Sequence, residues 1–187
     1  MKFLISGLGN PGPEYELTRH NIGFLTLDRL AEKHETTFST QRLADRAEFR
    51  TRGKTIHLIK PNTYMNLSGK AVSYWLQDLK ILRENLLVVV DDIALPFGMQ
   101  RMRAKGSSAG HNGLKNIEDL LGGQDYARLR MGIGSNYSKG QQVDYVLSRF
   151  EQEEFDALPS IMDKACEAIL AFCTIGIERA MNFHNTK

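Results

Sequence analysis

A run of five apolar residues, 86–90, restricts the fold of this 187-residue chain more than any other feature. The run reads Leu-Leu-Val-Val-Val and is bounded by polar residues, so it is too short for a helix of ordinary length. Uninterrupted apolar runs of this kind are typical of strands buried on both faces, in sheets that helices cover on both sides. The run leads directly into Asp91 and Asp92, so two carboxylates follow a buried strand. The sequence therefore predicts an α/β protein.

Strand and helix patterns alternate on either side of this run. We predict strands over residues 2–6, 47–51, 55–60, 99–104 and 127–133, the second and third forming a hairpin. Apolar spacing predicts helices over residues 22–34, 68–80, 110–121 and 152–182, the last broken near residues 174–176. Ser68 is expected to cap its helix. The expected fold is a three-layer sandwich in which helices flank a twisted, mixed and largely parallel sheet, in a single domain over residues 1–187.

Bulk composition excludes several classes of protein. The formal net charge of +2 excludes a strongly polybasic binder, and 42% hydrophobic with 25% charged residues excludes a wholly disordered chain. Cys166 and Cys173 lie about 10.5 Å apart along a helix, beyond the reach of a disulfide, so both are expected to be reduced and buried. No apolar run approaches the ~18 residues of a membrane helix, and the amino-terminal run is too short for a signal peptide. We therefore expect a cytoplasmic protein.

The loop after the first predicted strand is rich in glycine and carries Asn10. Glycines after a strand can cradle a phosphate, but Pro11 and Pro13 break the Gly-x-Gly-x-x-Gly pattern. A nucleotide-binding enzyme is therefore a weak hypothesis, ranked below the two functions considered at the end of this section. Asn10 and Asn21 are read either as turn or cap residues or as ligand-binding amides.

A carboxylate at the end of a buried strand can orient a histidine, and a pair of His20 with Asp91 would activate water. No Gly-x-Ser-x-Gly nucleophile elbow accompanies the pair. A third loop, residues 106–113, contains His111 and Asn112, and Asn112 is read either as a helix cap or as a ligand-binding residue. A metal site of His20, His111 and Asp91 is conceivable but disfavoured, because the chain has no helical histidine pair.

Positive charge gathers in two segments. Residues 96–117 carry four cations and no acid, and residues 126–142 carry three more cations and no acid. On a strand, Arg101, Arg103 and Lys105 would share one face. Such a face suits a polyanion held through its phosphates, although a merely solvated strand is the commoner outcome.

Five short segments, residues 7–12, 19–23, 65–69, 91–98 and 110–115, appear in the order found in the bacterial-type peptidyl-tRNA hydrolases. Through them the chain resembles that family over nearly its whole length. The resemblance implies an enzyme that hydrolyses the ester joining a peptide to the ribose at the tRNA 3′ end, and so recycles stalled or dropped-off peptidyl-tRNA during translation. It also implies a monomer with no metal, no cofactor and no DNA or membrane partner.

The same resemblance implies roles for individual residues. His20 matches the base that activates the attacking water, and Asp91 matches the acid that orients this base. The residues implied to bind substrate are Asn10, Tyr15, Met65, Asn66 and Asn112, and Asn112 is implied to position the water or the tRNA 3′ end. Arg103 and Arg130 match a basic pair that clamps the tRNA 5′-phosphate, so the protein is expected to grip the acceptor end.

A non-catalytic RNA-binding relative is the second hypothesis, because some members of the superfamily assist RNA processing in organelles. The intact His20 and Asp91, together with the three asparagines, argue against it. A hydrolysis assay on acetylated aminoacyl-tRNA separates the two hypotheses.

Overall fold

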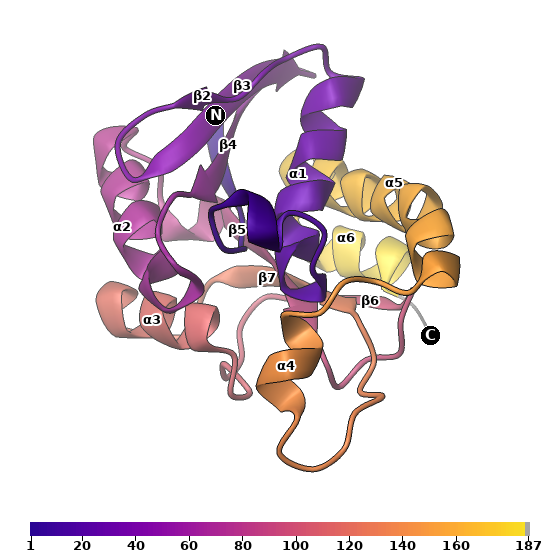
Figure 1. Ribbon diagram of the computed structural model, residues 1–187. Coiled ribbons are helices and arrows are strands. Elements are labelled where there is room, and N and C mark those ends of the chain that lie inside the picture. Colours follow the sequence, from indigo (N-terminus) through magenta and orange to yellow (C-terminus); the bar gives the residue numbers. More distant parts are fainter. Residues whose placement is uncertain (186–187) are drawn as a thin grey trace.

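The computed structural model describes residues 1–185, in which seven strands form one mixed sheet in the order β2-β3-β4-β1-β5-β7-β6 (Figure 1). The strands are β1 (Lys2–Gly7), β2 (Ser39–Thr40), β3 (Ala44–Thr51), β4 (Lys54–Pro61), β5 (Leu86–Asp92), β6 (Gln100–Arg103) and β7 (Ala127–Gly132). β4, β1, β5 and β7 run parallel, whereas β2, β3 and β6 add antiparallel edges. The expected mixed and largely parallel sheet is confirmed.

The apolar run lies at the centre of this sheet, and the predicted burial of both its faces is confirmed. β5 pairs in parallel with β1 on one side and β7 on the other, and residues 86–91 are all buried. Alternate side chains of β5 enter two separate apolar clusters: Leu87 and Val89 enter one, and Val88 and Val90 enter the other. A continuous apolar sequence is therefore required here, because neither face of the strand meets solvent.

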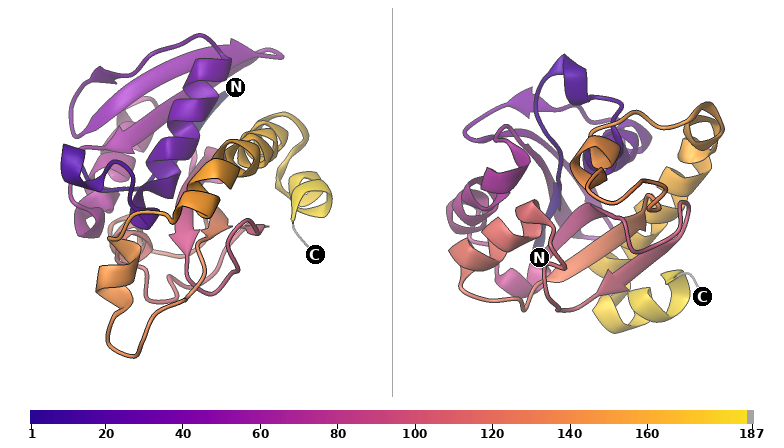
Figure 2. Two further views of the ribbon diagram at one scale, coloured as in Figure 1. Left: turned by 45° about the vertical axis from the view of Figure 1, so that its right-hand side comes forward. Right: turned by 60° about the horizontal axis from the view of Figure 1, so that its bottom comes forward.

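Helices cover both faces of the sheet and complete the three layers (Figures 1 and 2). The helices are α1 (Ile22–Lys33), α2 (Ser68–Asp78), α3 (Asn112–Leu121), α4 (Gln142–Val146), α5 (Gln152–Ile175) and α6 (Ile177–His184). α2 and α3 pack on one face, while α1, α5 and α6 pack on the other. None of the helices within residues 1–185 is long and apolar enough to cross a membrane.

Several local predictions are corrected by the structure. Ser68 does not cap α2: its hydroxyl donates to the carbonyl of Met65 at 2.7 Å, and Leu67 occupies the cap position without a side-chain bond. β6 ends at Arg103, so Lys105 lies outside the strand whose face it was expected to share. The short elements β2 and α4 were not predicted. The expected break in the last helix is confirmed at Gly176, which adopts φ 90° between α5 and α6.

Gly23 allows α1 to approach the sheet closely just after His20. A Cβ atom at Gly23 would lie 2.5 Å from the carbonyl oxygen of Val89 and 2.6 Å from the amide nitrogen of Leu8. Only glycine permits such contact between backbones. The start of α1 is thereby held against β1 and β5, which places the preceding turn beside the carboxyl end of β5.

Cys166 and Cys173 are both free and buried on α5, as expected. Burial raises the pKa of each thiol to about 12. With a pKa of about 12, only about one thiol in 10⁴ is ionised near pH 8. The thiolate is the form that reacts, so both thiols should be inert in the folded protein. We predict that the folded protein reacts negligibly with a disulfide reagent such as Ellman's at this pH, and that both thiols react at once in guanidinium. Fast stoichiometric labelling of the folded protein would contradict this burial.

Candidate active site

The carboxyl ends of three parallel strands bring distant segments together at one edge of the sheet. β1 leads into the loop of Asn10, β4 leads into the turn of Met65 and Asn66, and β5 ends with Asp91. His20 and His111 reach the same edge from the turns that precede α1 and α3. Such edges of parallel sheets are where α/β proteins place ligands.

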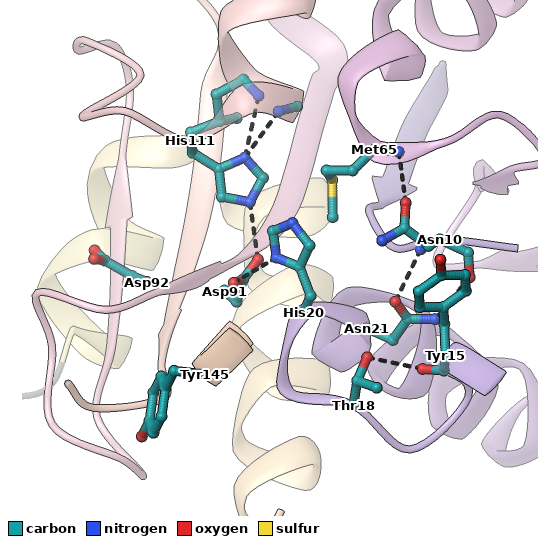
Figure 3. A network of polar contacts seen from close by, with 12 residues as sticks. Asn10, Tyr15, Thr18, His20, Asn21, Met65, Asp91, Asp92, His111 and Tyr145 are labelled. Carbon is teal, nitrogen blue, oxygen red and sulfur yellow. Dashed lines mark hydrogen bonds and ion pairs between the residues drawn. The ribbon is translucent and has the colours of Figure 1, made fainter. Parts of the chain in front are cut away.

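Asp91 is the centre of this site and accepts hydrogen bonds from two histidines. Nδ1 of His20 donates to Oδ2 at 2.8 Å, and Nε2 of His111 donates to Oδ1 at 2.8 Å (Figure 3). The Asp91 side chain is only 3% exposed, so both of its oxygens are turned away from water and towards these rings. The predicted His20–Asp91 pair is present, and His111 joins it.

The tautomers of both histidines follow from these bonds. Nδ1 of His111 accepts from the backbone amides of Gly113 at 3.1 Å and Leu114 at 3.3 Å, so the ring proton must sit on Nε2, facing Asp91. Asp91 likewise places the ring proton of His20 on Nδ1. The lone pair of His20 is therefore left on Nε2, the ring nitrogen directed away from Asp91 in Figure 3.

The charge of Asp91 is stabilised by its neighbours. Burial alone would raise the pKa of this carboxyl group, but attraction to His20 and His111 and their hydrogen bonds outweigh it. The pKa of Asp91 is held well below its usual range. Because a lowered pKa keeps the group ionised down to acid pH, Asp91 is a carboxylate throughout the neutral range.

The turn that carries His20 is fixed from both sides. The guanidinium group of Arg19 is buried, donates to the carbonyl of Arg149 at 2.8 Å and pairs with Glu154 at 2.8 Å. On the other side, the amide of Asn21 bonds both to the backbone nitrogen of Asn10 at 2.8 Å and to its carbonyl at 2.9 Å. Asn21 was read as a turn or ligand residue; its side chain instead holds the loop of Asn10, a contact that spacing alone does not reveal.

Asn10 presents a donor to the cleft. Its side-chain oxygen accepts from the backbone amide of Met65 at 2.7 Å, which fixes the orientation of the amide group. The Nδ2 donor is then left for a ligand (Figure 3). Asn10 therefore links the loop after β1 to the turn after β4 and still offers N–H groups to a substrate.

These residues line a cleft of about 300 Å³. Of the predicted site residues, those that line it are Asn10, His20, Met65, Asn66, Asp91, Asn112 and Arg130. Sequence analysis missed the apolar wall formed by Val143, Val146 and Leu147, on and just after α4. Asn112 is exposed in the cleft as the first residue of α3; His111, not Asn112, caps that helix.

Two predicted residues lie outside this cleft. Tyr15 is half-buried in the loop after β1, where its carbonyl accepts from the hydroxyl of Thr18 at 2.9 Å, and its ring is absent from the cleft lining. Arg103 is exposed on β6, away from the cleft lining.

Arg103 and Arg130 nevertheless share one face of the β6–β7 ladder. Arg103 lies opposite Arg128 and Arg101 lies opposite Arg130, so all four arginines point to the same side. Arg103 and Arg130 are diagonal neighbours, at roughly 7–8 Å in such ladders. Arg128 is fully buried and donates to the carbonyls of Gly106 and Gln124, each at 2.7 Å, so it anchors loops rather than facing solvent.

Asp92 does not supplement Asp91. Its Oδ1 accepts from the amide of Ala94 at 2.8 Å, and its Oδ2 lies 3.9 Å from Arg130. Figure 3 shows its side chain directed away from both histidines.

The three groups considered for a metal do meet: atoms of His20, Asp91 and His111 that could act as ligands lie within 4.8 Å of one another. A divalent ion on Nε2 of His111 would have to replace the proton now shared with Asp91. Nδ1 of His111 accepts from backbone amides, so it cannot take up the displaced proton without giving up its role as the cap of α3. If it kept that role, the ring would have to become an imidazolate anion. The donor set fits a hydrogen-bonded network better than a metal.

Fold and site together define an α/β enzyme with a histidine–carboxylate pair in a cleft. Such a pair can activate water, which is typical of a hydrolase. A family model for peptidyl-tRNA hydrolase matches residues 4–187. The chain belongs to the peptidyl-tRNA hydrolase family, which confirms the expected family, reaction and enzyme class.

Curated relatives and solved structures agree with this assignment. A peptidyl-tRNA hydrolase of Cytophaga hutchinsonii is 58% identical over 187 residues, all of both chains. One from Porphyromonas gingivalis is 54% identical over 99% of this chain and 100% of its own. The crystal structure of peptidyl-tRNA hydrolase from Acinetobacter baumannii superposes with a TM-score of 0.92 at 33% identity, covering 98% of this chain and 94% of that one.

Proposed function

We propose that His20 is the general base for hydrolysis of the peptidyl-tRNA ester. Nε2 of His20 takes a proton from water as the water oxygen attacks the ester carbonyl carbon. Asp91 holds the ring in the required tautomer and stabilises the imidazolium that forms. The tetrahedral intermediate then releases the ribose oxygen, which takes the proton back from His20. The observation that carries this proposal is the bond of His20 Nδ1 to a carboxylate that stays ionised.

Amide groups around the cleft support the rest of this proposal. The Nδ2 of Asn10 and the exposed amides of Asn66 and Asn112 are donors and acceptors of the kind that recognises peptide backbone and stabilises a developing oxyanion. The apolar wall with Met65 suits side chains of varied shape. We assign Asn10, Met65, Asn66 and Asn112 to substrate binding, with Asn112 next to the water or the tRNA 3′ end. We assign Tyr15, which lies outside the cleft lining, to substrate binding beyond the cleft.

Within the described chain, the hydrogen bond of His20 goes to Asp91 and to no serine or cysteine, which favours direct attack by water. An ester has a good leaving group, so general base catalysis suffices without a covalent intermediate. We further propose that residues 1–187 act as one catalytic domain and as a monomer, in the cytoplasm, without metal or cofactor.

The function is tested by incubating the purified protein with N-acetyl-aminoacyl-tRNA. We expect repeated turnover that releases acetyl-amino acid and free tRNA. Stable binding of tRNA without release would support a non-catalytic RNA-binding protein instead. Thermal stabilisation by a mononucleotide but not by tRNA would favour the nucleotide-binding alternative.

We also propose that Arg103 and Arg130, on one face of the β6–β7 ladder, clamp the tRNA 5′-phosphate, and this clamp yields a separate prediction. Arg103→Ala is expected to raise KM for the tRNA substrate several-fold and to reduce the slope of log KM against log salt by about one, because one phosphate contact is lost. The measurement is a salt series from low to moderate ionic strength. Arg52→Ala, at the exposed turn between β3 and β4, is the matched control and should leave the slope unchanged. An unaltered slope in Arg103→Ala would remove the phosphate role.

A further inference from the structure

The first turn of α2 obtains its cap from another helix. Leu67, at the cap position of α2, has no side chain that could accept a hydrogen bond. The backbone amide of Gly69 instead donates to the side-chain oxygen of Asn116 on α3, at 2.7 Å. The amides of a first helical turn have no partner within their own helix, so this bond satisfies a donor that would otherwise be buried and unpaired.

Two glycines allow α3 to approach the start of α2 and the turn before it closely. A Cβ atom at Gly69 would lie 2.7 Å from the carbonyl oxygen of Asn116, and one at Gly113 would lie 2.8 Å from the sulfur of Met65. α3 therefore packs directly against the turn Met65–Leu67. Close-packed contacts of this kind transmit a local displacement to their neighbours.

The segments joined at this junction carry amides from two sides of the cleft. Met65 and Asn66 lie in the turn just before α2, and Asn112 lies one helical turn before Asn116 on α3. The same turn is already tied to the first loop, because the backbone amide of Met65 donates to Asn10. Asn116 supplies the corresponding bond to α3. The loop after β1, the turn before α2 and the helix α3 are thereby linked to one another.

We propose that Asn116 is a positioning residue for the reaction, which sets the spacing between Asn66 and Asn112 through its bond to Gly69. This inference rests on the proposed function. Asn116 does not line the cleft, so it acts through its neighbours and not by touching substrate. A misplacement of about 1 Å in a substrate-binding group can cost about 10²-fold in rate, so loss of a single link is measurable.

The experiment compares variants of Asn116 in the full chain on N-acetyl-aminoacyl-tRNA. Asn116→Leu removes the acceptor, and we expect kcat/KM to fall about tenfold. Asn116→Asp keeps an oxygen at the same place, beside a helix amino terminus that favours negative charge, and should stay within about twofold of wild type. Asn116→Ala, a smaller change, is included in case the leucine variant does not fold.

A matched control separates positioning from general stability. The side chain of Asn85 donates to the carbonyl of Lys2 at 3.2 Å, at the opposite end of β1. Asn85→Leu should lower the melting temperature and leave kcat/KM unchanged.

A double-mutant cycle identifies the residue through which Asn116 acts. If Asn116 works by placing Asn66, adding Asn116→Leu to Asn66→Ala should cost far less than it costs in the wild type, because the group being placed is gone. Full multiplicativity of the two losses would overturn the proposal, as would normal kinetics of Asn116→Leu or a loss in Asn116→Asp equal to that in Asn116→Leu. Inactivity of the wild-type protein would refute the proposed function itself and is recognised separately.

Discussion

The variant His20→Ala is expected to lose about 10²–10⁴-fold in kcat on N-acetyl-aminoacyl-tRNA, the usual contribution of a positioned general base. Because Nδ1 of His20 donates its proton to Asp91, Nε2 is the ring nitrogen whose lone pair can take a proton from water. KM should change little, because the asparagines and arginines assigned to substrate binding remain. The measurement is a steady-state rate series with wild type and variant side by side.

The fold of His20→Ala should survive. His20 sits in a turn that Arg19 and Asn21 hold independently, through their bonds to Arg149 and Asn10. The melting temperature is expected to fall modestly, because the buried Asp91 carboxylate keeps only its bond to His111, while the turn itself stays folded. His184→Ala, on α6 and outside the cleft lining, is the matched control and should keep full activity. Full activity of a folded His20→Ala protein would end the proposed mechanism.

Asp91→Asn is expected to cause the second largest loss, about 10²-fold or more in kcat but less than His20→Ala. Asp91 accepts two N–H groups, whereas an asparagine offers one acceptor and one donor group. His111 cannot exchange tautomers freely, because its Nδ1 is occupied by the amides of Gly113 and Leu114. The donor of the asparagine should therefore face His20 and force its proton onto Nε2, the atom that must act as base.

This tautomer argument has a direct readout. The imidazole nitrogens of His20 can be followed by nitrogen NMR in wild type and in Asp91→Asn, where the protonated nitrogen should change from Nδ1 to Nε2. The loss in kcat and the change of tautomer should appear together. An Asp91→Asn protein with at least half of the wild-type kcat would contradict an orienting role for Asp91.

The central strand and its neighbours could be predicted because their signals are local. The run at residues 86–90 is apolar without interruption, and Gly176 breaks a long apolar stripe, so both features appeared where expected. β2 and α4 span only two and five residues, too short for a periodic pattern to register. Element boundaries and short elements depend on tertiary contacts that no window of sequence contains.

The site was predictable in its composition but not in its connections. The motifs pointed to His20, Asp91 and the three asparagines, yet the role of His111 arises from a bond to Asp91, 20 residues away. Asn112 was one of two candidate readings for the cap of α3, but the ring of His111 accepts from the amides of Gly113 and Leu114 and caps the helix instead. Asn21 and Asn116 likewise act on backbone groups 11 and 47 residues distant, and spacing along the chain carries no signal of such contacts.

The most direct test of the account is one turnover of N-acetyl-aminoacyl-tRNA by the wild-type protein in water enriched in oxygen-18, with both products and the protein analysed by mass. Attack by a His20-activated water on the ester predicts one heavy oxygen in the carboxylate of the released acetyl-amino acid. It also predicts an unlabelled, full-length tRNA and a protein of unchanged mass at every time point. Heavy oxygen in the tRNA, an acylated protein, or no release at all would contradict the account.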